Sequence, residues 1–506
     1  MKVMGRWSAK TVDVWADGTG LSSRAGTSLL ALVADRVGLT SGLRDALAGT
    51  RERRGGHEPG RVFCDLAVML ADGGRCVSDL QALAGQSSLF GDVASVSTAR
   101  RVVLSVGESG LAGVRAARAA ARARTWAAGA APERVIIDFD ATPIDVHSEK
   151  EQAAGHYKGG FGFNPLLVTC DREVLAGILR PGSAGANNVA DHLELLDLAL
   201  EQLPQSALDG EILARSDSAG ASHDLADACR ECDVRFSFGY RIGEPVREAL
   251  LSLEESAWRP AIDQDGQPRE GAWVTELTGN VNLPDWPEGT RLICRRERPH
   301  PGAQLTFTDL DGHRFQCFIT DQTGEDIAAL EALHRQHAQV EDCVKTLKAT
   351  GANFLPFRSF QANAAWLELA LCAHDIMIWT QLLTLDGEHQ ICEPKAAALP
   401  DPARRRAAHP PRQTRDPPPP RRLALGRGGP ARLQTPPSAP RTRLTRQPAT
   451  TTITTGAAPI AATRKRPPHQ PTATKREAPS AARDVDPTAH PLQSPPKHQP
   501  SPPDSY

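Results

Sequence analysis

The stretch "VIIDFDATPIDVHSEK", from Val135 to Lys150, decides how this chain folds. It opens with apolar β-forming residues, which predict a buried strand. It then places carboxylates at Asp138 and Asp140, where that strand ends. The strands and helices later in the chain explain why a buried strand would end on acids.

Two further strands are predicted at "GFNPLLVTCD" and "REVLAGILR", joined as in a hairpin. A helix at "NVADHLELLDLALEQL" precedes the strand "EILARSDS", the short helix "ASHDLADACREC" and the strand "VRFSFGY". The order is three strands, helix, strand, helix, strand. This is the order of the ribonuclease-H-like α/β fold, in which the first strand lies beside the fourth.

This strand order explains why acids follow the first and fourth strands. Asp140 closes the first strand and Asp217 closes the fourth, so adjacent parallel strands would present both carboxylates at one edge of the sheet. Two carboxylates there repel each other unless a cation lies between them, and such hard oxygen ligands suit Mg²⁺ or Mn²⁺. The alternative is that both acids only cap turns or helices, because Asp is common after strands.

A third acid lies on an amphipathic helix predicted to begin near Glu325. Its apolar face is formed by Ile327, Leu330, Leu333, Val340, Val344 and Leu347. Glu341, Lys345 and Lys348 follow one another along a neighbouring stripe. They are either a surface ion pair of the kind common on helices, or a metal ligand with phosphate-binding lysines behind it.

Composition separates an ordinary globular part from an unusual tail. The 506 residues carry a formal net charge of −2, yet residues 393–506 hold 26 of the 40 prolines and 20 Lys or Arg against 7 Asp or Glu. Such a segment buries too little apolar surface to offset chain entropy, so we expect a disordered basic tail that could touch DNA electrostatically. The rest of the chain is acidic, so DNA contact there must come from local basic patches.

The chain reads as a soluble, cytoplasmic protein without a membrane partner. No apolar run is long enough to span a membrane, and no signal-peptide core comes after "MKVMGRWSAK". The ten scattered cysteines predict reduced thiols, and Cys229 and Cys232 lack the partners of a zinc site.

The sequence from Thr27 to about Trp126 is helical, and "SVSTARRVVL" allows a helix-turn-helix. Arg115, Arg118 and Arg122 recur along one helix face. They predict either a phosphate-facing stripe or a solvated helix face.

The chain resembles the DDE transposases of bacterial insertion sequences, in the superfamily of insertion sequence four and, within it, the group numbered thirteen-eighty. The resemblance covers roughly Ala31 to Lys395. It rests on "IIDFDATPIDVHSEKEQAAGHYKGGFGFNPLL", "LRPGSAGANNVADH", "ARSDSAGASH", "HRQHAQVEDCVKTLKATGANFLPF" and "NAAWLELALCAHDIMIW".

The resemblance assigns the catalytic, metal-binding acids to Asp140, Asp217 and Glu341. Asp138 remains an alternative first ligand, because alternation along a strand puts it on the same face as Asp140; Asp140 is preferred for its place before the Ala-Thr pair. The family's last signature is Tyr, two residues, Arg, three residues, Glu, six residues, Lys. Glu341 and Lys348 match it, whereas His334 and His337 occupy the Tyr and Arg positions, and Arg335 could partly substitute.

The implied activity is metal-dependent cleavage at terminal inverted repeats and strand transfer to target DNA, with two Mg²⁺ or Mn²⁺ ions per site. The implied partner is double-stranded DNA, bound by a homodimer. The resemblance also implies an insertion domain that touches the transposon end. The expected DNA contacts are Lys345, Lys348, Arg335, Arg291, Arg295, Arg296 and Arg298. For the four arginines from Arg291 to Arg298, a solvated run of charges is the alternative. The alternatives are a related metal-dependent nuclease, and an inactive relic that only binds DNA.

The predicted organisation has five parts. They are a helical N-terminal DNA-binding region (1–130), the first part of the ribonuclease-H-like core (131–240), a β-rich insertion domain (241–322), the C-terminal helices of the core (323–392) and the tail (393–506). The abrupt change to Pro-, Arg-, Ala- and Thr-rich sequence after Lys395 predicts a frameshift in a GC-rich gene. Such a frameshift would explain how an inactive relic arose.

Overall fold

The computed structural model describes residues 15–16, 24–51, 56–147, 149–185, 188–299, 309–310, 312–324, 326–385 and 421–422. The chain divides into two compact units, Met1–Thr435 and Pro436–Tyr506, and all described residues belong to the first. No helix in the described ranges combines the length and apolar character needed to cross a membrane. The predicted tail and its proposed frameshift lie outside these residues, apart from Arg421–Arg422.

The N-terminal part is helical, as predicted. Its helices are α1 (Ala25–Arg36), α2 (Leu39–Leu47), α3 (Pro59–Ala71), α4 (Gln81–Ala84), α5 (Ser87–Phe90), α6 (Val96–Ser105) and α7 (Glu108–Thr125), with short segments at Ala48–Thr50, Val77–Leu80 and Trp126–Ala130. The strand β1 (Trp15–Ala16) pairs with β15 (Arg421–Arg422). Helix α3 starts with Pro59 at its first position and a Glu58 carboxylate that accepts from two backbone amides, both common helix-start signals. It is buried almost throughout, which makes it the centre of this helical part.

The central sheet follows the predicted strand order. Its strands are β2 (Val135–Ala141), β6 (Leu166–Cys170), β7 (Glu173–Ile178), β8 (Ile212–Ser216) and β9 (Val234–Tyr240), in the spatial order β7-β6-β2-β8-β9. Strand β2 pairs antiparallel with β6 and parallel with β8, so the prediction that the first strand lies beside the fourth is confirmed. The intervening helices are α8 (Val189–Glu201), α9 (Gln205–Leu208) and α10 (His223–Glu231). A separate small sheet holds β3 (Ile144–Asp145), β5 (Phe161–Phe163) and β4 (Ala154–Gly155).

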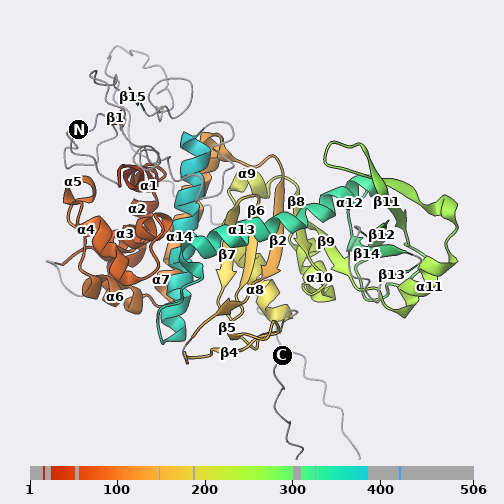
Figure 1. The fold of residues 1–506 in the computed structure, drawn as a ribbon, viewed down its shortest axis with the longest axis horizontal. Helices are drawn as coiled ribbons and strands as arrows, with labels where there is room; N and C mark the ends of the chain where they lie inside the picture. Colours follow the sequence, from red (N-terminus) through yellow and green to blue (C-terminus); the bar gives the residue numbers. More distant parts are fainter. Residues whose placement is uncertain are drawn as a thin grey trace, which may run out of the picture. The chain divides into compact units, whose positions relative to one another are not determined.

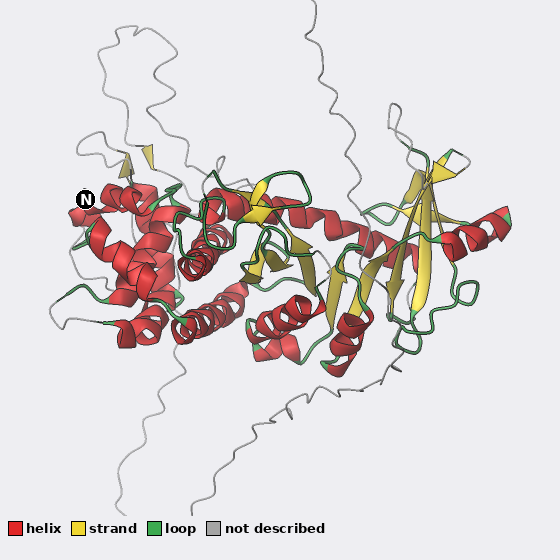
Figure 2. Cartoon of the chain, turned by 90° about the horizontal axis from the view of Figure 1, so that it is seen from below, coloured by secondary structure: helices red, strands yellow, loops and turns green. Residues whose placement is uncertain are grey.

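Both faces of this sheet are covered by helices (Figure 2). Along β6, Leu166 and Val168 pack into the cluster that contains α8 and α10, whereas Leu167 packs on the opposite face against α13 and α14. Alternate residues of a strand point to opposite faces, so a strand covered on both sides is apolar at every position. This accounts for the unbroken apolar run "PLLV" in the sequence.

The β-rich insertion extends the core sheet instead of forming a sheet of its own. Its elements are α11 (Glu244–Ser252), a short turn of helix at Glu255–Ala257, β10 (Arg259–Ile262), β11 (Pro268–Glu276), β12 (Arg291–Glu297), β13 (Asp309–Leu310) and β14 (His313–Thr320). Strand β14 pairs antiparallel with β9, and the order continues outward as β12-β11-β10. The predicted strand content is present, but the sheet is continuous with the core.

The C-terminal helices return to the core. They are α12 (Ile327–Arg335), a 3₁₀ segment (Gln336–Gln339), α13 (Val340–Leu347), a π-type segment (Lys348–Ala352) and α14 (Phe360–Thr384). Helix α12 begins after Asp326, whose side chain caps it. Helix α14 is buried on nearly all sides because α1, α3 and α7 pack against it as well as β7 (Figure 1).

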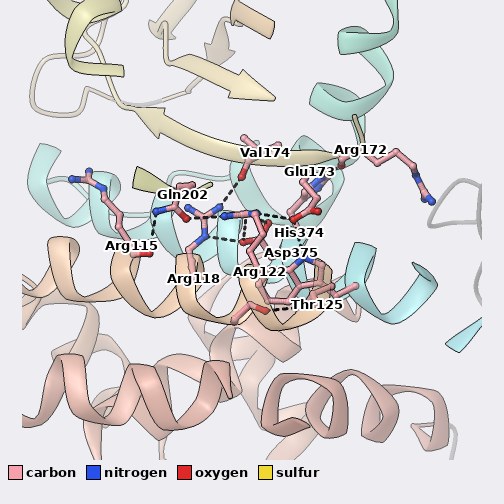
Figure 3. A network of polar contacts seen from close by, with 12 residues as sticks. Arg115, Arg118, Arg122, Thr125, Arg172, Glu173, Val174, Gln202, His374 and Asp375 are labelled. Atoms are coloured by element: carbon pink, nitrogen blue, oxygen red, sulfur yellow. Dashed lines mark hydrogen bonds and ion pairs between the residues drawn. The ribbon is translucent and has the colours of Figure 1, made fainter. Parts of the chain in front are cut away.

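The arginine stripe on α7 is buried. Arg118 and Arg122 are 0% exposed and point toward acids on α14 and β7 (Figure 3). Arg118 donates to Asp375 and Glu368, each at 2.8 Å, and to the Val174 carbonyl at 2.7 Å. The predictions of a phosphate-facing stripe and of a solvated face are therefore both wrong at these two positions.

Arg122 completes this network. Its guanidinium donates to Glu173 at 2.7 Å, to Gln202 at 2.8 Å and to both oxygens of Asp375 at 3.0 Å. The Trp126 and Trp379 indoles also donate to Glu173. We call Arg118, Arg122, Glu173, Glu368 and Asp375 the α7–α14 network. It joins the N-terminal helices to the core through charge pairs that have no access to water.

His374 on α14 makes stability depend on pH. Its Nε2 lies 2.9 Å from the Arg172 carbonyl oxygen, and burial lowers its pKa from the usual 6.5 to about 4. Between these values only the unfolded chain takes up the proton, so falling pH favours unfolding, by about tenfold in the equilibrium constant per pH unit. We expect His374→Gln, which keeps an N–H donor but does not titrate, to flatten the decline in melting temperature between pH 6.5 and 4 relative to the parent. Equal slopes for the two proteins would contradict this expectation.

Candidate functional site

Two of the predicted acids meet at one edge of the sheet. The parallel register of β2 and β8 pairs Phe139 with Ser216, so Asp140 and Asp217 come next at neighbouring positions. Burial raises the pKa of Asp140, and the negative charge of Asp217 raises it further, while His337 acts in the opposite direction. The two carboxylates are thus close enough to repel each other, as the strand order predicted.

Asp217 is held by the turn after β8. Its Oδ1 accepts hydrogen bonds from the Ala219 amide at 2.9 Å and the Gly220 amide at 3.1 Å. The turn-capping alternative is therefore correct for one oxygen of this acid. The side chain is exposed, and Oδ1 is the oxygen that takes part in hydrogen bonds with described residues. The turn fixes the direction of the carboxylate and leaves a face toward solvent.

Gly239 on β9 makes room for this turn. A Cβ at this position would lie 2.6 Å from the Ser218 nitrogen and 2.9 Å from the Asp217 carbonyl carbon. Both contacts are shorter than van der Waals distance, and both involve backbone atoms that cannot move without displacing Asp217. A side chain at position 239 would therefore disturb the acid.

Asp138 is engaged elsewhere. It is 4% exposed and forms a two-pronged ion pair with Arg215, in which Nε to Oδ1 and Nη2 to Oδ2 are both 2.7 Å. His337 Nδ1 lies 2.9 Å from Oδ1 of the same carboxylate. Both oxygens already have partners, whereas Asp140, two residues further, is half-buried at the strand end. Asp140 is thus the better placed of the two to face a ligand.

Glu341 lies on the helix stripe that faces these acids. It is exposed in the first turn of α13, one turn after His337 and two turns before Lys348. His337 contacts Asp138 and Lys348 Nζ donates to the Pro143 carbonyl at 3.0 Å, so both flanking residues face the end of β2. Within the described part of the chain, no three His, Cys, Asp or Glu side chains are close enough to hold a metal ion. The structure brings Asp140 and Asp217 to neighbouring positions, and it places Glu341 on the helix stripe that faces the end of β2.

Lysines surround the same edge. Burial lowers the pKa of half-buried Lys348, and the charge of Lys158 lowers it further, while Asp140 raises it. Lys158, in the turn between β4 and β5, was not predicted from the sequence, where nothing placed this turn near the acids. The predicted contact Lys345 is exposed on α13. Lys158 and Lys348 thus supply positive charge beside Asp140.

His334, at the family's Tyr position, faces the interior. Its ring stacks on Phe318 at 4.3 Å between centroids, and its Nδ1 lies 2.9 Å from the Ser237 hydroxyl. Burial lowers the pKa of His334 to about 3. Arg335 is half-buried and donates to Glu331 and to the Ile262 carbonyl. Neither side chain extends freely from the helix.

Most of the predicted arginine cluster in the insertion is paired within the fold. Arg291 binds Glu276 with both prongs, and Arg295 donates to Glu331 at 2.7 Å. Arg296 pairs with Glu255 and lies over the rings of two tryptophans. Arg298 is exposed over the Trp273 ring. Their DNA contacts stay a prediction, and the geometry favours Arg298 over the three paired residues.

Comparison with known proteins agrees with these features. The family model described as transposase DDE domain group 1 matches residues 5–395. A solved structure of a piggyBac transposase synaptic complex with hairpin DNA matches 77% of this chain and 83% of that chain, at 11% sequence identity and a TM-score of 0.37. A TM-score this low establishes neither a shared fold nor a shared function. No curated protein matches. The chain belongs to the transposase DDE domain group 1 family.

Proposed function

We propose that this DDE transposase cleaves DNA at terminal inverted repeats and joins the freed ends to target DNA, as an enzyme of a bacterial insertion sequence. The observation that carries the proposal is the pairing of Asp140 and Asp217 at one edge of a parallel strand pair, with Glu341 on the helix that crosses it. Membership of the family supplies the transposase class. The inverted repeats, the target and the insertion-sequence group rest on the resemblance in sequence.

The donor chemistry of the site fits a divalent cation. Burial raises the pKa of Asp140, and the charge of Asp217 raises it further; a cation between the two carboxylates would remove the repulsion between them. Carboxylate oxygens are the ligands that Mg²⁺ and Mn²⁺ prefer, and Glu341 would complete the set. Asp140, Asp217 and Glu341 would hold such ions, and the chemistry the ions would supply is activation of the attacking water or 3′-hydroxyl and stabilisation of the leaving oxygen.

The other residues of the edge suit a phosphate backbone. Lys348 and Lys158 lie beside Asp140, and Lys345 is exposed on α13 three residues before Lys348, so these lysines can neutralise DNA phosphates that approach the carboxylates. Arg298 is the exposed arginine of the insertion cluster that could extend this contact. Because two ends must be joined, we propose that the working form on DNA is a homodimer.

The test is an assay of cleavage and joining with the full chain, Mg²⁺ and DNA that carries the flanking inverted repeats. We expect nicked and joined products that disappear when the metal is chelated or the repeat is scrambled. Cleavage without joining would indicate a nuclease instead. Binding with neither product would indicate an inactive relic.

One observation favours the alternative of an inactive relic that only binds DNA. The family match ends at residue 395, where the Pro- and Arg-rich sequence begins. A frameshift at this point would leave the three acids intact and replace every residue after it. Reading the gene in its other frames is the test, and a lack of any ordered, Leu- and Trp-containing continuation would exclude the frameshift.

A further inference from the structure

A buried polar cluster lies next to the proposed catalytic acids, two residues earlier on each strand. We call Asp138, Arg215 and His337 the support cluster. Asp138 binds Arg215 with both oxygens and accepts from His337, and Arg215 Nη1 also donates to the Leu333 carbonyl at the end of α12. Asp138 and Arg215 are 4% exposed. The cluster therefore joins strand β2, strand β8 and the α12–α13 helix inside the protein.

Each member of the support cluster stands at a fixed offset from one acid. Asp138 precedes Asp140 by two residues on β2, and Arg215 on β8 precedes Asp217, the first residue after that strand, by two residues. Residues two apart on a strand share a face, so each acid continues the face of its supporting residue toward the sheet edge. His337 precedes Glu341 by four residues, which is close to one helical turn.

The contacts of the support cluster hold the helix that carries Glu341 against the two strands. Two parallel strands alone fix Asp140 against Asp217 through their register. The helix carries no backbone ladder to either strand, so Glu341 is positioned by side-chain contacts. His337 to Asp138 and Arg215 to the Leu333 carbonyl are contacts of this kind, and they lie four and eight residues before Glu341 along the chain.

We propose that Asp138, Arg215 and His337 are positioning residues that bring Glu341 to the metal-binding pair Asp140 and Asp217. An ionised carboxylate only accepts, so His337 donates through Nδ1 and needs no charge to do so. The inference rests on the proposed function, because it assigns the support cluster to the metal site. The same role accounts for His337 at the position where the family signature has arginine, because its side chain contacts Asp138.

The test compares Mn²⁺ binding by the full chain on DNA with an inverted-repeat end, measured by electron paramagnetic resonance of free Mn²⁺. His337→Ala removes the donor and is expected to weaken Mn²⁺ binding by about 10-fold or more, as loss of a residue that orients a ligand does. His337→Asn places an amide N–H near the Nδ1 position and is expected to restore most of the affinity. The melting temperature is followed for each variant.

Asp375→Asn is the matched control, because it removes a buried, arginine-paired carboxylate that belongs to the α7–α14 network and not to the support cluster. It is expected to lower the melting temperature and leave Mn²⁺ affinity unchanged. If His337→Ala binds Mn²⁺ as the parent does, or if both His337 variants behave alike, the positioning role is wrong although the function stands. If Asp217→Asn in the parent background leaves Mn²⁺ binding unchanged, the proposed metal site itself is wrong.

Discussion

Asp140→Asn, Asp217→Asn and Glu341→Gln are each expected to slow DNA cleavage by at least about 10²–10³-fold, the loss seen when one group that stabilises transition-state charge is removed. The amides keep the shape of the side chains but carry no charge to hold a cation. Folding should not suffer. Burial and Asp217 raise the pKa of Asp140, so the ionised carboxylate costs stability at neutral pH and the neutral amide relieves that cost.

Asp138→Asn provides the contrast for this prediction. Asp138 is buried between Arg215 and His337, and removing its charge leaves the Arg215 guanidinium buried without a counter-charge. Breaking one partner of a buried pair costs about 3–5 kcal/mol. We therefore expect Asp138→Asn to lower the melting temperature, and Asp140→Asn to leave it unchanged or raised. Single-turnover cleavage and melting curves of the two variants separate the roles, and the reverse pattern would make Asp138 the ligand.

The sequence predicted those parts of the fold that depend on local pattern. Strand periodicity and the order of elements were enough to place β2 beside β8, and this neighbourhood put Asp140 next to Asp217. The amphipathic pattern after Asp326 likewise located the helix that carries Glu341. The direction of each side chain follows from the period of its element, and the neighbourhood of the two strands follows from the order of elements in the ribonuclease-H-like fold.

The sequence could not show contacts between distant segments. Arg122 meets Asp375 across 253 positions, and His337 meets Asp138 across 199. A helix face rich in arginine looks solvated until the acids opposite it are known. The same limit applies to the insertion, whose strands join the core sheet because β14 pairs antiparallel with β9. The pairing of Arg295, a predicted DNA contact, with Glu331 was likewise not visible in the sequence.

The α7–α14 network carries the second large expected effect. Asp375 is fully buried and is the shared partner of Arg118 and Arg122. Asp375→Asn leaves two guanidinium groups with one counter-charge fewer in a region that water does not reach. We expect a loss of about 3–5 kcal/mol in the free energy of unfolding, measured as a lower urea midpoint. Tryptophan fluorescence reports on this region, because Trp126 and Trp379 both donate to Glu173 of the network.

Arg115→Gln is the matched control for this effect. Arg115 lies on the same helix face and also pairs with Glu368, but at 3.4 Å and with a side chain that is 21% exposed. A partly solvated pair of this kind contributes about 0–1 kcal/mol. If burial is what makes the network costly to break, Asp375→Asn must lower the urea midpoint several times more than Arg115→Gln does. Equal shifts would mean that apolar packing holds the helices α7 and α14 together, and that the buried ion pairs add no more stability than the partly solvated one.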